Sequence, residues 1–204
     1  MTAFTKDSMK FHLMPLALSL AIALGAASTS ATELAPLQSV ESVNLNRYLG
    51  RWYQIAHYPN KFQAQCVSDT TADYRLLPTG RIEVVNQCKT ATGMTDKAVG
   101  EARLAQPRIL GIPVGKVVST SKLQVRFAPA VLGWVPGVWA PYWVVQLAPD
   151  YRYAVVSEPD RDYLWILSRT PTLAAQDRAA IDAQLQQQGF DLARLQEDPH
   201  TAQP

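Results

Sequence analysis

Residues 122–127 read KLQVRF and residues 95–104 read TDKAVGEARL, and both stretches alternate in character. Successive side chains of a β-strand point to opposite faces, so this alternation predicts strands with one face toward water. In the first stretch the inward face would carry Leu123, Val125 and Phe127, opposite polar residues. In the second it would carry Leu104 and three small residues that leave space inside a barrel, namely Ala98, Gly100 and Ala102.

Outward from these stretches, the chain between Trp52 and Arg169 is a series of short segments rich in Val, Ile, Tyr and Trp, separated by Pro, Gly, Asn and Asp. Such segments are typical of strands, and eight antiparallel strands can close into a barrel that holds one small ligand. We therefore predict an all-β fold, with strands over residues 52–58, 67–76, 81–88, 95–104, 122–128, 142–147, 152–157 and 163–168.

One helix is expected after the last strand. Thr172 can cap its start, residues 173–188 would form it, and Gly189 would end it. Ile181 and Leu185 lie one turn apart on one face, so the helix must pack on something apolar. The outer wall of the barrel is the expected partner, and three residues would extend the contact: Phe190, Leu192 and Leu195.

The two cysteines, Cys66 and Cys88, are expected to form a disulfide. The turn at residues 77–80, LPTG, would bring them to roughly opposite positions on neighbouring strands. A zinc site is the alternative, but it would need two further ligands, and only His57 and His200 are available beyond residue 31. We expect no metal and no cofactor.

Residues 1–31 look like a secretory signal peptide. Basic residues precede an apolar run over residues 13–27, and small residues follow it as signal peptidase requires. A start at Met9 would give a more ordinary signal. An uncleaved membrane anchor is the alternative, although a spanning helix needs roughly 20 residues. Export would let the cysteines pair. The remainder divides into a linker over residues 32–43, a barrel domain over 44–196 and a loose tail over 197–204.

Two function classes find little support in the residues. The formal net charge is +2 and there is no long basic run, so the sequence does not predict a basic surface for binding nucleic acid. An enzyme would need a complete catalytic site, such as a nucleophile with a base, a pair of carboxylates or a metal. Ser157, His57 and an aspartate could be imagined as a catalytic triad, but their spacing in the sequence does not support one. We expect no catalytic residue. Haem binding through His57 remains an alternative.

Two motifs resemble the lipocalin family. Residues 44–53, NLNRYLGRWY, resemble its N-terminal Gly-x-Trp signature, here Gly50 and Trp52, and residues 158–171, EPDRDYLWILSRTP, resemble the last hairpin of bacterial lipocalins. The resemblance covers residues 44–195. It implies an eight-stranded antiparallel up-and-down barrel with a C-terminal helix, in which Trp52 plugs the closed base and Arg169 stacks across it. It also implies a fatty acid or lysophospholipid as ligand.

The resemblance bears on location as well. Bacterial members include outer-membrane lipoproteins, but no cysteine lies near the expected cleavage region, so a lipid anchor on an N-terminal cysteine is not expected. We expect a periplasmic or secreted protein that could associate with the outer membrane. The residues leave open whether it is a monomer or a homodimer.

The segment over residues 128–142, APAVLGWVPGVWAPY, is more apolar than a solvated connection requires. In a lipocalin it would join the fifth and sixth strands at the open mouth. One hypothesis is that Trp134, Trp139 and Tyr142 dock the mouth on a bilayer, since Trp and Tyr favour the membrane interface. The alternative is that the segment folds back as a lid.

Alternation selects seven candidates for contact with the ligand: Tyr58, Val84, Leu123, Val125, Phe127, Tyr153 and Val155. Ordinary core packing is the alternative for each of them, because small barrels are largely filled by side chains. The polar head of a ligand is expected at the rim of the barrel. Four cations are candidates to meet it, and none can be singled out: Lys61, Arg75, Lys122 and Arg126.

Overall fold

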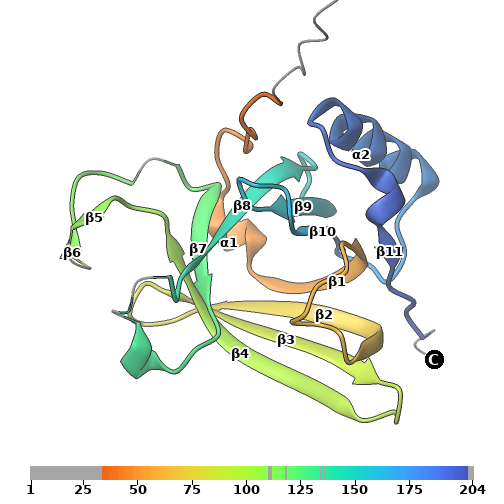
Figure 1. Ribbon diagram of the computed structural model, residues 1–204, viewed down its shortest axis with the longest axis horizontal. Coiled ribbons are helices and arrows are strands. Elements are labelled where there is room, and N and C mark those ends of the chain that lie inside the picture. The colour runs from red at the N-terminus through yellow and green to blue at the C-terminus, as the bar shows by residue number, and fades with distance from the viewer. Residues whose placement is uncertain (1–33, 110–111, 118, 134, 136, 202–204) are drawn as a thin grey trace, which may run out of the picture. The chain divides into compact units, whose positions relative to one another are not determined.

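The computed structural model describes residues 34–201, apart from 110–111, 118, 134 and 136. The expected signal peptide and Trp134 lie outside the described residues. In the described part, eight antiparallel strands form a closed barrel, because the last strand pairs with the first (Figure 1). The predicted fold is confirmed, and the wall strands are β1 (Gly50–His57), β2 (Cys66–Leu76), β3 (Ile82–Thr90), β4 (Thr95–Leu104), β7 (Lys122–Arg126), β8 (Ala140–Leu147), β9 (Tyr153–Ser157) and β10 (Leu164–Ser168).

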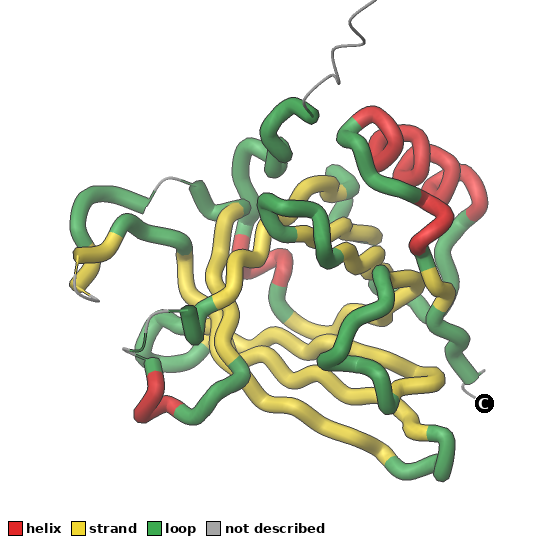
Figure 2. The backbone as a smooth tube through the Cα atoms, in the orientation of Figure 1, coloured by secondary structure: helices red, strands yellow, loops and turns green. Residues whose placement is uncertain are grey.

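The connections contain short elements of their own (Figure 2). Strands β5 (Arg108–Ile109) and β6 (Ile112–Pro113) pair with each other between β4 and β7. The connection between β7 and β8 carries one 3-10 turn, η1 (Ala130–Leu132), and a second one, η2 (Leu192–Arg194), follows the C-terminal helix.

One end of the barrel is closed by the segment that precedes β1. Helix α1 (Leu45–Tyr48) is capped by the side chain of Asn44, and Trp52 behind it is fully buried. The Trp52 indole N–H donates to the backbone oxygen of Tyr48 at 2.8 Å. The Arg169 guanidinium lies 3.8 Å from the centre of the Trp52 ring. The contact expected between Trp52 and Arg169 is therefore present.

Helix α2 (Ala175–Gln187) packs on the outside of the wall. Ile181 and Leu185 are buried in a cluster with wall residues that include Ile55 and Ile166. Gly189, which follows the helix, has a φ of +80°, a conformation that favours glycine and ends the helix as expected. The N-cap is Ala174, without a side-chain hydrogen bond, so the cap predicted at Thr172 is wrong.

A bulge between Gln54 and Ala56 shifts the register of β1 against β10 by one residue. Beyond it, His57 pairs with Trp165, which packs against the core inside the barrel. Directly paired residues point to the same face of a sheet, so His57 faces inward like Trp52. Simple alternation counted from Trp52 would place His57 on the outer face, and the bulge reverses this orientation.

The C-terminal segment completes the wall between β1 and β2. Strand β11 (Gln196–Glu197) pairs with β1 where β2 has turned away. Asp69, at a φ of 56° in β2, receives hydrogen bonds from the backbone and hydroxyl of Thr201 at 2.7 and 2.8 Å. Residues 197–201, expected to be a loose tail, are thus bound to the barrel.

Candidate functional site: the barrel interior

The inner face of the barrel is apolar and contains several small side chains. Val84 and Leu123, predicted as candidates, are buried in the interior cluster, and Val125 packs against it. Ala98 faces the interior, because it pairs with Asn86, which pairs with Ala72 beside Trp52. Ala98 is nevertheless exposed, and Ala72 and Val125 are half-buried. Solvent therefore reaches the inner face between the closed end and the mouth.

Three of the predicted contact residues lie on the other side of the wall. Tyr58, Tyr153 and Val155 belong to the cluster between the wall and α2. The expected inward orientation of all three is wrong. β9 is covered on both faces, so alternation does not distinguish the two faces for Tyr153 and Val155. For Tyr58, the bulge in β1 reverses the alternation. Tyr58 lies beyond the end of β1, and its hydroxyl donates to the backbone oxygen of Asp191 at 2.8 Å.

Phe127 follows the last residue of β7 and is 43% exposed. It lies against Gly100: a Cβ added to this glycine would lie 2.7 Å from the Phe127 ring and 2.5 Å from the Arg126 carbonyl oxygen. The space expected at Gly100 is therefore occupied by Phe127 and the backbone of β7. A side chain at residue 100 would displace the chain where it leaves the wall.

The apolar segment after β7 is anchored to the outer wall. The Trp139 ring lies 3.7 Å from the Arg103 guanidinium, and its indole N–H donates to the Gly133 carbonyl at 2.8 Å. Tyr142 belongs to β8 and pairs with Leu123, so it points into the barrel. Neither side chain is placed to meet a bilayer at the mouth, which corrects the docking hypothesis for these two residues.

The four cations proposed for a ligand head group are not gathered in one place. Arg126 is 3% exposed and donates to Glu101 and to the Pro129 carbonyl. Lys122 lies 3.9 Å from the Trp143 ring on the outer face. The remaining two also have partners, since Arg75 pairs with Glu83 and Lys61 lies over Phe62.

At the closed end, three tyrosine hydroxyls meet inside the barrel. Tyr48 comes from α1, Tyr74 from β2 and Tyr142 from β8. The Tyr142 hydroxyl lies 2.9 Å from the hydroxyls of both Tyr48 and Tyr74. Burial raises the pKa of Tyr74 to about 12 and the pKa values of Tyr48 and Tyr142 well above their usual range. All three hydroxyls therefore keep their protons. We call this group the tyrosine triad.

Alternation along β2 and β8 could have suggested that Tyr74 and Tyr142 face inward. The meeting of the three hydroxyls was missed because it depends on long-range pairing between α1, β2 and β8. Sequence spacing contains no signal for that distance.

A polar network lines the other end of β1. The Trp165 indole donates to Gln63 at 2.8 Å, and Gln63 donates to Gln54 at 2.9 Å. Gln54 in turn donates to Asp198 at 2.8 Å and lies 3.1 Å from the imidazole of His57. Burial lowers the pKa of His57, and the nearby Asp198 carboxylate opposes this only in part. His57 is therefore neutral at pH 7.

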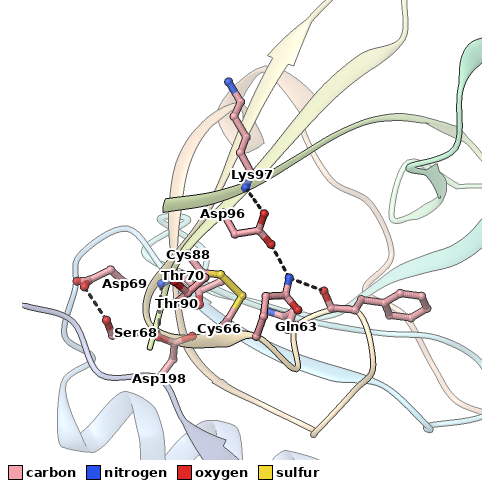
Figure 3. The surroundings of a disulfide bond; sticks show 12 residues. Gln63, Cys66, Ser68, Asp69, Thr70, Cys88, Thr90, Asp96, Lys97 and Asp198 are labelled. Carbon is pink, nitrogen blue, oxygen red and sulfur yellow. Dashed lines mark hydrogen bonds between the residues drawn. A yellow bond between two sulfur atoms is a disulfide. The ribbon is translucent and has the colours of Figure 1, made fainter. Parts of the chain in front are cut away.

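The predicted disulfide is present. Cys66 at the start of β2 is bonded to Cys88 near the end of β3, with their Cα atoms 5.6 Å apart (Figure 3). Nearby, the Gln65 amide donates to Asp96 at 2.5 Å, which links the β1–β2 connection to β4. The disulfide thus stabilises the wall at the end opposite the tyrosine triad.

The groups considered for catalysis do not come together. Ser157 pairs with Trp143 on the outer face and donates to the Tyr163 carbonyl at 2.6 Å, whereas His57 faces the interior. Among the described residues, no group of three or more His, Cys, Asp or Glu side chains could hold a metal ion. The same part of the chain contains no helix with the length and apolar character needed to span a membrane.

Comparisons with known proteins agree with this architecture. The family model of the lipocalin-like domain matches residues 43–200. Temperature-induced lipocalin-1 of Arabidopsis thaliana is 34% identical over 85% of this chain and 88% of its own length. Outer membrane lipoprotein Blc of Escherichia coli is 33% identical over 90% of this chain and 95% of its own length. The solved structure of insecticyanin from the tobacco hornworm Manduca sexta covers 83% of this chain and 87% of its own, with a TM-score of 0.59 and 18% identity.

Proposed function

Because the chain belongs to the lipocalin family, we propose that its barrel binds a small lipid-like molecule, a fatty acid or lysophospholipid, and carries or stores it in the cell envelope. Family membership supports binding of a small hydrophobic ligand. The observation that carries the lipid proposal is the apolar inner face, which solvent reaches at Ala98, Ala72 and Val125. Such a concave apolar surface suits a molecule that is mostly hydrocarbon.

The envelope location rests on the export signal expected over residues 1–31 and on the similarity to proteins named outer membrane lipoproteins. A periplasmic or secreted protein with this ligand could serve membrane maintenance. Cell fractionation and N-terminal sequencing of the exported chain would test the location independently of the ligand.

The cargo can be identified directly. We expect native mass spectrometry of the mature protein from its own compartment to reveal a stoichiometric adduct, and lipid extraction to identify it as a fatty acid or lysophospholipid. A protein that carries no lipid and takes up neither class would contradict the proposal. A Soret band after haem titration would instead favour the pigment alternative through His57.

A matched pair of substitutions tests whether the ligand lies inside the barrel. Ala98 faces inward, whereas its neighbour Val99 faces outward and is 53% exposed. We expect Ala98→Trp to weaken palmitate binding at least about tenfold, because the indole occupies space that the ligand needs. Val99→Trp is expected to leave the Kd unchanged. Equal affinities in the two variants would place the ligand elsewhere.

A further inference from the structure

The tyrosine triad has more donors than it has partners. Each of its three hydroxyls carries one hydrogen, and the group makes two hydroxyl–hydroxyl hydrogen bonds. One hydrogen therefore has no acceptor among the described residues. Tyr48 and Tyr74 are 4% and 7% exposed and Tyr142 is half-buried, so this donor is largely shielded from bulk water. A buried donor without a partner is costly, which favours an acceptor supplied from the barrel interior.

The triad is also accessible from the interior. Tyr142 is half-buried although both of its hydroxyl partners are buried. Above it, the inner face carries the small residues Ala72 and Ala98. Tyr74 pairs with Val84 of β3, and β3 continues from Val84 to Thr90 toward the mouth. At the usual rise per residue, this part of the strand is about 20 Å long. An extended chain that enters at the mouth would need to span about this length to reach the triad.

The electrostatic surroundings favour an acceptor of negative character. Arg169 lies against the far side of Trp52, and its charge lowers the pKa values of Tyr48 and Tyr74, against the larger raising effect of burial. Among the described residues, no carboxylate is a main cause of the raised pKa of a triad tyrosine. Because hydroxyl hydrogens rotate, any one of the three hydroxyls can present the remaining hydrogen to an oxygen atom.

We propose that the tyrosine triad binds the carboxyl end of a fatty acid at the closed end of the barrel, so that the hydrocarbon tail runs toward the mouth. This orientation rests on the proposed lipid-binding function and reverses the expectation of a polar head at the rim. It assigns the recognition of the head group to hydroxyl donors and not to Lys61, Arg75, Lys122 or Arg126.

Removal of all three hydroxyls tests the assignment. The variant Tyr48→Phe/Tyr74→Phe/Tyr142→Phe keeps the aromatic packing and leaves no partner of the triad unpaired, so it is expected to fold. We expect the Kd for palmitate to rise at least about tenfold, as for loss of a hydrogen bond to a charged group. Hexadecyltrimethylammonium has a tail of the same length but no acceptor, so its Kd should not rise. Tyr153→Phe, on the outer face, is the matched control.

The position of the head group can be measured in the wild-type protein. With palmitate labelled with ¹³C at the carboxyl carbon or at the terminal methyl, a soluble gadolinium chelate should broaden the methyl signal and spare the carboxyl signal. Broadening of the carboxyl signal alone would overturn the assignment, and so would a triple variant that binds palmitate as tightly as the wild type. Neither result would contradict lipid binding itself. If palmitate and lysophospholipid both fail to bind the wild type, the proposed function itself fails.

Discussion

At the residue scale, Arg169 combines several roles at the closed end. Its guanidinium lies on the Trp52 ring and donates to the backbone oxygens of Arg51 and Arg47, each at 2.7 Å. These bonds connect the residue that follows β10 to the neighbouring elements α1 and β1, which lie far from it along the chain. A planar guanidinium can stack and donate in two directions at once, which an ammonium group cannot.

We therefore expect Arg169→Lys to destabilise the protein by about 1–2 kcal/mol, although the charge is kept. Urea unfolding should show a lower midpoint with an unchanged slope. Arg75→Lys, in the exposed pair with Glu83, should change stability by less than about 1 kcal/mol. Equal effects of the two substitutions would contradict the role given to Arg169.

At the element scale, α2 is held on the wall by packing and by ion pairs, of which Arg152–Asp177 joins it to β9 and Arg178–Glu197 joins it to β11. Arg152, just before β9, donates to both carboxylate oxygens of Asp177 in the first helical turn, at 2.8 and 2.6 Å. These hydrogen bonds lower the pKa of Asp177. The first turn of the helix is thus attached to the wall, although the cap predicted at Thr172 is not formed.

The pair makes the attachment of the helix sensitive to acid. A carboxyl whose pKa is lower in the folded state stabilises the fold above its usual pKa of about 4 and loses this contribution as pH falls through the lowered value. We expect Asp177→Asn to lower the Tm at pH 7, and the difference from wild type to shrink as pH falls below about 4. Asp182→Asn, in the pair with Arg178, is the control. A difference in Tm that does not depend on pH would contradict this account.

At the scale of the whole molecule, the barrel is closed at one end by α1, Trp52 and the tyrosine triad. Toward the other end, the wall depends on the disulfide and on the C-terminal segment that fills the gap beside β1. Backbone hydrogen bonds tie this segment down, from Asp198 to Ile55 at 2.8 Å and from Asp69 to Pro199 at 2.9 Å. The half of the barrel near the mouth is therefore held together by its own long-range contacts, namely the disulfide and the hydrogen bonds of the C-terminal segment.

The disulfide should therefore contribute strongly to stability. The cysteines are separated by 22 positions in sequence, and loss of the disulfide is expected to cost about 3 kcal/mol in the chain-entropy model. The variant Cys66→Ser/Cys88→Ser and the reduced wild-type protein should show the same fall in the free energy of unfolding. A large fall in one but not in the other would point to a local effect of the serines.

The sequence by itself determined the strands, the disulfide partners, the apolar face of α2 and the family signature around Trp52 and Arg169. These follow from local alternation, turn residues and short motifs, which act over a few neighbouring positions. The orientation of residues near a bulge was decided only by tertiary structure. The bulges in β1 and β8 shift the alternation, and they place His57 inward and Gln146 outward.

Tertiary structure also decided the contacts and orientation of the aromatic side chains. Trp139 lies on Arg103 and Tyr142 meets Tyr48 and Tyr74, contacts between residues far apart along the chain. Tyr153 and Val155 face α2, because β9 is apolar on both faces and only the position of the helix separates them. Contacts across such distances depend on how the barrel closes, and local sequence patterns do not encode that closure.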